Sequence, residues 1–273
     1  MMNIQTSPKV SVIMGVYNCK DFRLLKKSVD SIITQTFTDW EFIICNDGST
    51  DLTLQKLNQI AQIDTRIKII SYKQNRGLAY ALNQCIMASK GEYIARQDDD
   101  DISEPERFQE QVDMLDAYSE YAVVGTNARV FDDSGFWGEY TNVEFPDKNA
   151  FLWNSPFSHP TVMMRKNVLL EAGCYRVAKE TRRCEDYDLF MQIYALGYKG
   201  CNIQKMLYQY RIVNDNKKYR PMKYRLDEAK VRCTGYKKLG IFLKGLPFVM
   251  KPIVIGLIPQ SIFKKIRKKQ YYK

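Results

Sequence analysis

The sequence predicts an α/β fold with a doubly wound, mainly parallel sheet, and three observations support this fold class. Four short apolar runs, rich in β-branched and aromatic residues, occur within the first hundred residues. Segments with the apolar spacing of helices separate these runs, which is typical of alternating strands and helices. Each run ends in a polar loop, and loops after parallel strands gather at one edge of the sheet, where such folds bind ligands.

Four strands are expected in the first hundred residues because short continuous apolar runs are typical of strands covered on both faces. They lie at residues 10–14, 40–45, 67–72 and 93–95. Residues 22–33 are expected to form a helix, since Leu25, Val29 and Ile32 recur at helical spacing. Further helices are expected after the turn at 46–51 and over 78–88.

The pattern becomes less regular after Glu104. The expected elements there are a helix at 105–118, strands near 122–124 and 161–164, and an amphipathic helix at 186–196. We therefore predict one domain over residues 1–216, with halves at about 8–104 and 105–216. A helical, basic and partly apolar tail is expected over 217–273.

The positive charge of the chain is concentrated in this tail. The net charge is +10, but residues 217–273 hold 17 of the 41 Lys and Arg and only two of the 31 acidic residues. A nucleic-acid-binding protein more often carries its basic surface on the folded domain, so we expect no nucleic-acid partner. A basic, apolar tail instead indicates an anionic membrane surface.

Residues 241–263 are apolar and about long enough to span a bilayer. They contain Lys244, Lys251 and three prolines, so a segment lying on the membrane is expected rather than a spanning helix. The alternative is a solvated tail that packs its apolar side on the domain.

Seven cysteines without a CxxC spacing indicate a reducing compartment. With no apolar signal region at the start, we expect a cytoplasmic protein, peripheral on the inner face of the cell membrane.

Four consecutive aspartates, Asp98, Asp99, Asp100 and Asp101, directly follow the fourth expected strand. Adjacent carboxylates repel one another, and their hard oxygens suit Mg²⁺ or Mn²⁺. The alternative is a solvated acidic turn before the next helix. Asp47 lies at the end of another strand, where its carboxylate could accept a hydrogen bond from a nucleobase or ribose, or could form a plain Asx turn.

Together these blocks resemble the family 2 glycosyltransferases, which have the GT-A fold, over roughly residues 8–212. The blocks occur in the family's order, at residues 10–18, 35–37, 46–51, 75–79 and 91–101. The resemblance makes 8–104 the nucleotide-binding half and 105–216 the acceptor half of a catalytic domain. One departure is Gly15, where the family often has Pro or Thr.

The resemblance implies a role for each matching residue. Gly15, Val16 and Tyr17 would line the base pocket, Asp47 would bind the base, typically uracil, and Arg76 would lie near the nucleotide. The acidic run matches the family's DxD motif. Asp100 would be the direct ligand of Mn²⁺ or Mg²⁺, while Asp98 and Asp99 would touch ribose, sugar or metal-bound water.

The segment 184–189 resembles the family's ED motif at a helix start, which implies that Asp186 is the catalytic base. A carboxylate within reach of a sugar hydroxyl can take its proton as the new bond forms. Glu185 could orient Asp186 or contact the acceptor. The alternative is that these acids only favour a helix N-terminus. His159, the only histidine, and Trp153 are further candidates near the active site, although either could be structural.

The resemblance implies inverting, metal-dependent transfer of one sugar from a nucleotide-diphosphate sugar, with a UDP-linked donor expected. The acceptor would be a hydroxyl of a lipid-linked or surface glycan, as in lipopolysaccharide, capsule or exopolysaccharide synthesis. The QxxRW block of processive members is absent, which favours single transfer. The alternatives are a non-catalytic nucleotide-sugar-binding subunit and a sugar-nucleotide nucleotidyltransferase, which would need a Gly-rich basic loop after the first strand.

Overall fold

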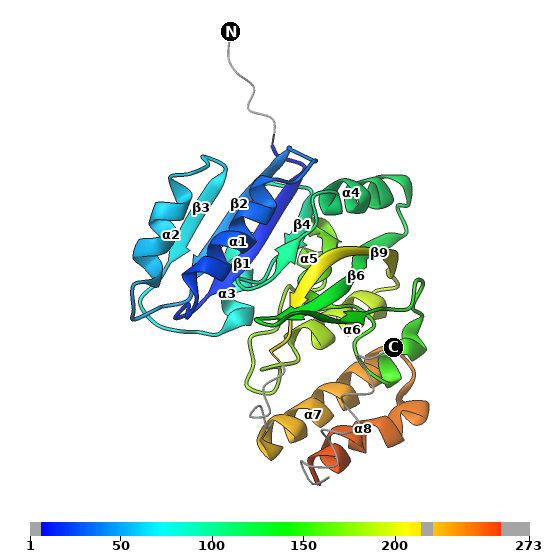
Figure 1. The fold of residues 1–273 in the computed structure, drawn as a ribbon. Coiled ribbons are helices and arrows are strands. Elements are labelled where there is room, and N and C mark those ends of the chain that lie inside the picture. Colours follow the sequence, from blue (N-terminus) through cyan, green and yellow to red (C-terminus); the bar gives the residue numbers. More distant parts are fainter. Residues whose placement is uncertain (1–6, 214–220, 258–273) are drawn as a thin grey trace.

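A computed structural model describes residues 7–213 and 221–257 of the chain. Within these residues the strands form one sheet in the order β3-β2-β1-β4-β8-β6-β9-β5, and β7 pairs with β6 beside this path (Figure 1). Helices cover both faces of the sheet (Figure 1). The predicted α/β class is therefore confirmed, with a sheet that is mixed but mostly parallel.

The four predicted strands of the first half are present and mutually parallel. They are β1 (Val10–Val16), β2 (Trp40–Asn46), β3 (Ile67–Ser71) and β4 (Tyr93–Arg96). The connecting helices are α1 (Phe22–Ile33), α2 (Thr53–Ala61) and α3 (Leu78–Ala88). The sheet order places β1 between β2 and β4, so the loops that follow these three strands are neighbours.

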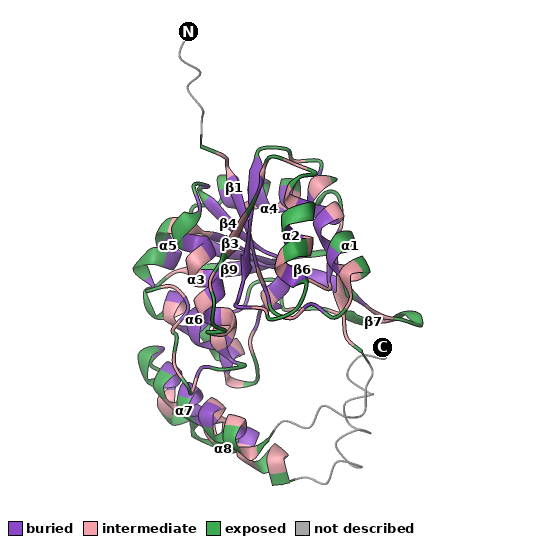
Figure 2. Cartoon of the chain, turned by 90° about the vertical axis from the view of Figure 1, so that its left-hand side faces the viewer, coloured by how far each residue is buried: buried purple, intermediate pink, exposed green. Residues whose placement is uncertain are grey.

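Alternate side chains of each strand enter two different cores, because successive side chains of a strand point to opposite faces. On β1, Val12 and Met14 pack on the side of α1, α2 and α4. Ile13 between them packs with α3, α5 and α6 on the other side. Both faces are buried (Figure 2), which explains why the strands read as continuous apolar runs.

The elements of the second half of the domain were predicted only in part. It contains β5 (Ile102–Ser103), α4 (Arg107–Ala117), β6 (Tyr121–Asp132), β7 (Gly135–Tyr140), β8 (Met163–Arg165), α5 (Lys166–Glu171), α6 (Glu185–Ala195) and β9 (Lys199–Arg211). Short 3₁₀ segments cover Lys148–Leu152 and His159–Thr161. The predicted strand at 161–164 begins two residues later because the second 3₁₀ segment precedes it.

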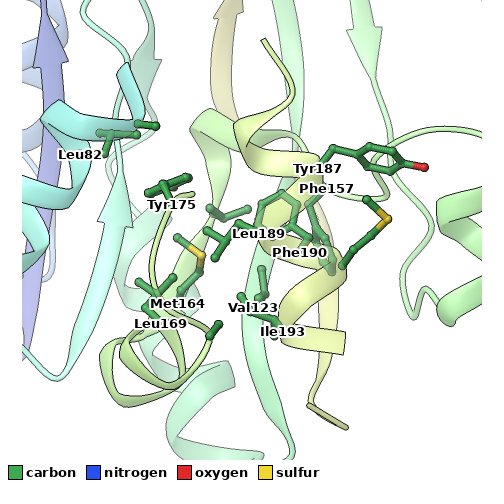
Figure 3. Packing of buried hydrophobic residues seen from close by; sticks show 14 of the residues in the cluster. Leu82, Val123, Phe157, Met164, Leu169, Tyr175, Tyr187, Leu189, Phe190 and Ile193 are labelled. Atoms are coloured by element: carbon green, nitrogen blue, oxygen red, sulfur yellow. The ribbon is translucent and has the colours of Figure 1, made fainter. Parts of the chain in front are cut away.

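β8 is antiparallel to both β4 and β6, and β9 runs parallel to β6. The long strand β9 was not predicted. Behind this part of the sheet, α6 packs Leu189, Phe190 and Ile193 against Val123 and Met164 (Figure 3). This packing fixes the position of the first turn of α6.

The C-terminal part forms two helices, α7 (Met222–Lys238) and α8 (Phe242–Leu257), which pack on each other beside α6 (Figure 1). A helix from about 221 was predicted. Val231 and Tyr236 of α7 belong to the hydrophobic core that contains α6, so α7 packs against the domain that precedes it in the chain. α8 includes Pro247 and Pro252. None of the helices in residues 7–213 and 221–257 is long and apolar enough to cross a bilayer.

Candidate active site

The acidic run follows β4 in a loop that side chains of α1 and of the preceding residue hold in place. The Ser28 hydroxyl donates to the Asp98 carbonyl at 2.7 Å. The Gln97 amide Nε2 donates to the Asp101 carbonyl at 2.9 Å, and the Gln97 backbone N–H donates to the Ile13 carbonyl of β1 at 3.1 Å. The loop is thus anchored at both ends.

The four carboxylates have different surroundings. Asp98 forms an ion pair with the fully buried Arg96. Asp101 is also fully buried, and its Oδ1 accepts the backbone N–H of Arg211 at 2.7 Å. Asp100 lies 3.8 Å from the Arg211 Nη1 and keeps 45% of its side chain exposed. Asp101 is therefore the buried member of the run, whereas Asp98, Asp99 and Asp100 remain partly exposed.

The electrostatics of the run fit a cation. Burial, followed by the charges of Asp100 and Asp98, raises the pKa of Asp99 to about 7. Burial and the same two neighbours raise the pKa of Asp101 well above its usual range. Within the described residues no three His, Cys, Asp or Glu gather into a metal-binding group. The partly exposed carboxylate of Asp100 suits an ion such as Mg²⁺, which uses one or two carboxylates and completes its shell with substrate phosphates.

Asp47 at the end of β2 is buried, and its carboxylate is occupied by the loop after β3. Oδ1 accepts from the Tyr72 hydroxyl at 2.7 Å and from the Arg76 N–H at 2.8 Å. Oδ2 accepts from Asn75 Nδ2 at 2.8 Å and from the Gly77 N–H at 2.9 Å. Two bonds to each oxygen use the lone pairs of both. Asp47 thus fixes the loop that carries Arg76, a role that the sequence did not reveal, while direct base binding stays a prediction.

Backbone contacts hold the neighbouring loops together at this edge. The Asn18 N–H donates to the Ser49 hydroxyl, and the Thr50 N–H donates to Asn18 Oδ1, both at 2.9 Å. Gly48 has a φ of +67°, and a Cβ there would lie 2.4 Å from the Gln74 carbonyl carbon, so this turn requires glycine. The loops after β1, β2 and β3 therefore form one connected rim.

The remaining candidates for the base pocket lie along this rim. Tyr17 is 49% exposed, whereas Val16 is buried. A Cβ on Gly15 would lie 3.1 Å from Leu78 Cδ1, so the glycine lets α3 lie close to β1. The Arg76 guanidinium lies 4.7 Å from the Tyr80 ring centroid. Their roles toward a nucleotide stay predictions.

A pocket of about 470 Å³ joins the acidic run to α6. Asp100 lies in its wall on one side, and Asp186, from the first turn of α6, lies in the same wall. Residues 86 positions apart in the sequence thus face one space. The volume is within the roughly 300–1,000 Å³ of small-molecule sites.

The acids at the start of α6 differ in what they contact. Asp188 is 6% exposed and is held by Arg176, whose Nη2 donates to Asp188 Oδ1 at 2.9 Å. Asp186 lines the pocket, and Glu185 is outside its lining. All three are favoured at a helix N-terminus, but Asp186 is the one placed for chemistry in the pocket.

His159 also lines the pocket, and its Nε2 lies 2.7 Å from the hydroxyl of the buried Tyr175. Burial and the charge of Arg96 lower the pKa of His159 well below its usual value, so the imidazole is neutral at pH 7. Trp153 is elsewhere. It is 63% exposed, and its ring lies 3.7 Å from Lys251 Nζ of α8, outside the pocket lining.

Four arginines at the site were not among the predicted site residues. Arg183, Arg211 and Arg232 line the pocket, while Arg96 pairs with Asp98 of the acidic run. Arg96 could have been suspected as a counter-ion, since it stands two residues before the run. Arg211 and Arg232 are far away in the sequence, and no local pattern marks them.

A sheet of this kind, with an acidic loop after its fourth strand and an acidic helix start at the same pocket, agrees with the arrangement expected of a nucleotide-sugar transferase. The model of the family "Glycosyl transferase family 2" matches residues 11–179. The chain is also 38% identical over 268 residues to EpsE of Bacillus subtilis (strain 168), covering 98% of this chain and 96% of that one. This chain belongs to glycosyl transferase family 2.

Other relatives agree with the family and the fold. The chain is 30% identical to the O-antigen biosynthesis glycosyltransferase WbnJ of Escherichia coli, covering 89% of this chain and 92% of that one. S. aureus TarS 1-349 in complex with UDP-GlcNAc superposes with a TM-score of 0.69 at 17% identity, covering 89% of this chain and 73% of that one. The mannosyltransferase PcManGT from Pyrobaculum calidifontis, in complex with GDP-Man and Mn²⁺, gives 0.62 at 16% identity, covering 97% and 81%. The similarity to the two structures shows the GT-A fold.

Proposed function

We propose that this chain transfers one sugar from a nucleotide-diphosphate sugar, UDP-linked, to a hydroxyl of a lipid-linked or surface-glycan acceptor, with inversion at the anomeric carbon. The observation that carries the proposal is the single pocket lined by both Asp100 and Asp186. The names of WbnJ and TarS, an O-antigen enzyme and a UDP-GlcNAc complex, support the acceptor class and the donor class.

The acidic loop binds the donor diphosphate together with Mn²⁺ or Mg²⁺, for which Asp100 is the protein ligand. When bound, the ion stabilises the negative charge that grows on the departing diphosphate. Asp98 and Asp99 belong to the same loop as Asp100, and the ion pair of Asp98 with Arg96 keeps this loop fixed. The complex of PcManGT with Mn²⁺ supports this proposal.

Asp186 is the base in this proposal. The acceptor hydroxyl donates a hydrogen bond to its carboxylate and loses its proton as the oxygen attacks the anomeric carbon. The leaving diphosphate departs on the side of the acidic run, opposite the attacking oxygen, so one displacement inverts the configuration. His159, neutral and held by Tyr175, presents a hydrogen-bonding group to the same pocket.

A donor screen tests this function. The purified chain is incubated with Mn²⁺ and UDP-, GDP- or dTDP-sugars, and release of the nucleoside diphosphate is followed. We expect turnover with UDP-sugars that stops when EDTA is added. Absence of binding and turnover with every donor would contradict the proposal.

We further propose that the enzyme works in the cytoplasm, on the inner face of the cell membrane, to which α8 attaches it. Large apolar side chains recur on α8 at spacings of three and four residues, which places them on one face. They are Leu243, Leu246, Met250, Val254 and Leu257, each at least 47% exposed. Phe248 and Val249 pack against the core instead. The sequence that follows, outside the described residues, has five Lys or Arg within 264–269.

An apolar helix face next to a basic segment suits an anionic lipid surface. Replacing Leu246 and Met250 by Glu is therefore expected to lower binding to phosphatidylglycerol vesicles by on the order of a hundredfold, since two apolar side chains that would insert into the lipid are lost. Sedimentation with vesicles measures this. The control is Leu170→Glu with Leu196→Glu, two comparably exposed leucines away from α8. Equal loss in both variants, or none in the first, contradicts attachment through α8.

A further inference from the structure

The wall of the pocket next to Asp186 includes α7. Glu228 and Arg232 of α7 line the same space as Asp100 and Asp186. α7 lies outside residues 11–179, the part that the family model matches, and packs beside α6 (Figure 1). Of the two C-terminal helices, α7 therefore completes the pocket, while α8 bears the exposed apolar face.

Arg232 fixes this wall. It is 2% exposed, and its Nη1 donates to the Leu152 carbonyl at 3.1 Å and to the Tyr236 hydroxyl at 2.7 Å. Its Nε donates to Glu228 Oε1 at 2.9 Å. A buried guanidinium with several partners has little freedom to move, so the carboxylate of Glu228 is held at one place in the wall.

Two aromatic residues line the same pocket from the sheet side. The rings of Tyr140, at the end of β7, and Tyr210, near the end of β9, are 6.4 Å apart and almost perpendicular. Sugar rings offer C–H faces that pack on aromatic rings, and hydroxyl groups that donate to carboxylates. A fixed carboxylate together with tyrosine rings suits a pyranose better than an apolar or an anionic ligand.

We propose that Glu228, Tyr140 and Tyr210 form a subsite for the glycosyl residue that carries the accepting hydroxyl, with Glu228 as a specificity-determining residue. This inference rests on the proposed function, because it places the acceptor where Asp186 can reach its hydroxyl. The donor diphosphate belongs to the acidic run, and α7 packs against the helix that bears Asp186. The acceptor sugar therefore lies between α6, α7 and the ends of β7 and β9.

The test uses the full chain, Mn²⁺, the UDP-sugar that the wild type turns over best, and octyl glycosides of glucose, galactose and N-acetylglucosamine. Glu228→Gln keeps an oxygen for Arg232 but removes the charge. We expect the KM for the glycoside to rise by on the order of tenfold, with kcat within about twofold.

Asp227→Asn is the matched control, since it makes the same charge change on α7 while Asp227 lines a separate groove with Leu226 and Lys230. Tyr140→Ala tests the subsite without touching the buried pair of Glu228 and Arg232, and it should also raise the glycoside KM. The inference is overturned if both variants keep the wild-type KM, if Asp227→Asn shows the same change, or if no glycoside alters wild-type turnover of the donor. A wild type without any donor turnover would instead refute the proposed function.

Discussion

Asp186→Asn is expected to reduce sugar transfer by roughly a thousandfold while donor binding is retained, because a positioned general base contributes on the order of 10²–10⁴ in rate. Asp186 faces the pocket that also contains Asp100, and asparagine keeps its size but cannot take a proton. The measurement is transfer to an acceptor in parallel with calorimetric titration of UDP in the presence of Mn²⁺.

Asp188→Asn is the matched control for this prediction. The same change two residues further along α6 removes the charge that Arg176 pairs with, at a residue outside the pocket lining. Breaking this ion pair, whose carboxylate is buried, is expected to lower the melting temperature with a much smaller effect on kcat. Normal transfer by Asp186→Asn would show that the base lies elsewhere.

Asp100→Ala is expected to abolish the metal dependence of donor binding. The wild type should bind UDP roughly a hundredfold more tightly with Mn²⁺ than with EDTA, since Asp100 would hold an ion that attracts the diphosphate. The variant should bind equally weakly in both. The same calorimetric titration measures both affinities.

Asp133→Ala controls for effects that pass through Arg211. Asp133 is 82% exposed and pairs with the Arg211 Nη2 at 2.9 Å, so its loss disturbs the same arginine without removing a carboxylate from the run. Metal-dependent binding should survive in this variant. Retention of the Mn²⁺ effect in Asp100→Ala would move the metal ligand to another aspartate of the run.

The first half of the fold could be predicted because β1, β2 and β4 are buried on both faces, and because a regular helix follows each of β1, β2 and β3. The strand β9 could not, since polar and apolar residues alternate irregularly along it and its partner β6 lies about 80 residues earlier in the chain. Its end is nevertheless essential to the site. It brings the Arg211 backbone to Asp101 and Tyr210 to the pocket.

The site could also be predicted only in part. Asp100 and Asp186 stand in local motifs, and the structure brings them to one pocket. The four hydrogen bonds on Asp47 come from residues 25 to 30 positions away, so no local pattern could show that its carboxylate is already occupied. The same holds for Glu228, whose place in the wall depends on how α7 packs against α6.

In the proposed reaction the leaving diphosphate and the base lie on opposite sides of the reacting carbon, and the anomeric configuration of the product tests this most directly. The wild type is supplied with an α-linked UDP-sugar and an octyl glycoside, and the coupling constant of the new anomeric proton is measured by NMR. We predict a β-linked product, formed in one displacement with Asp186 as the base. An α-linked product would contradict the account, because retention cannot arise from a single attack opposite the leaving group.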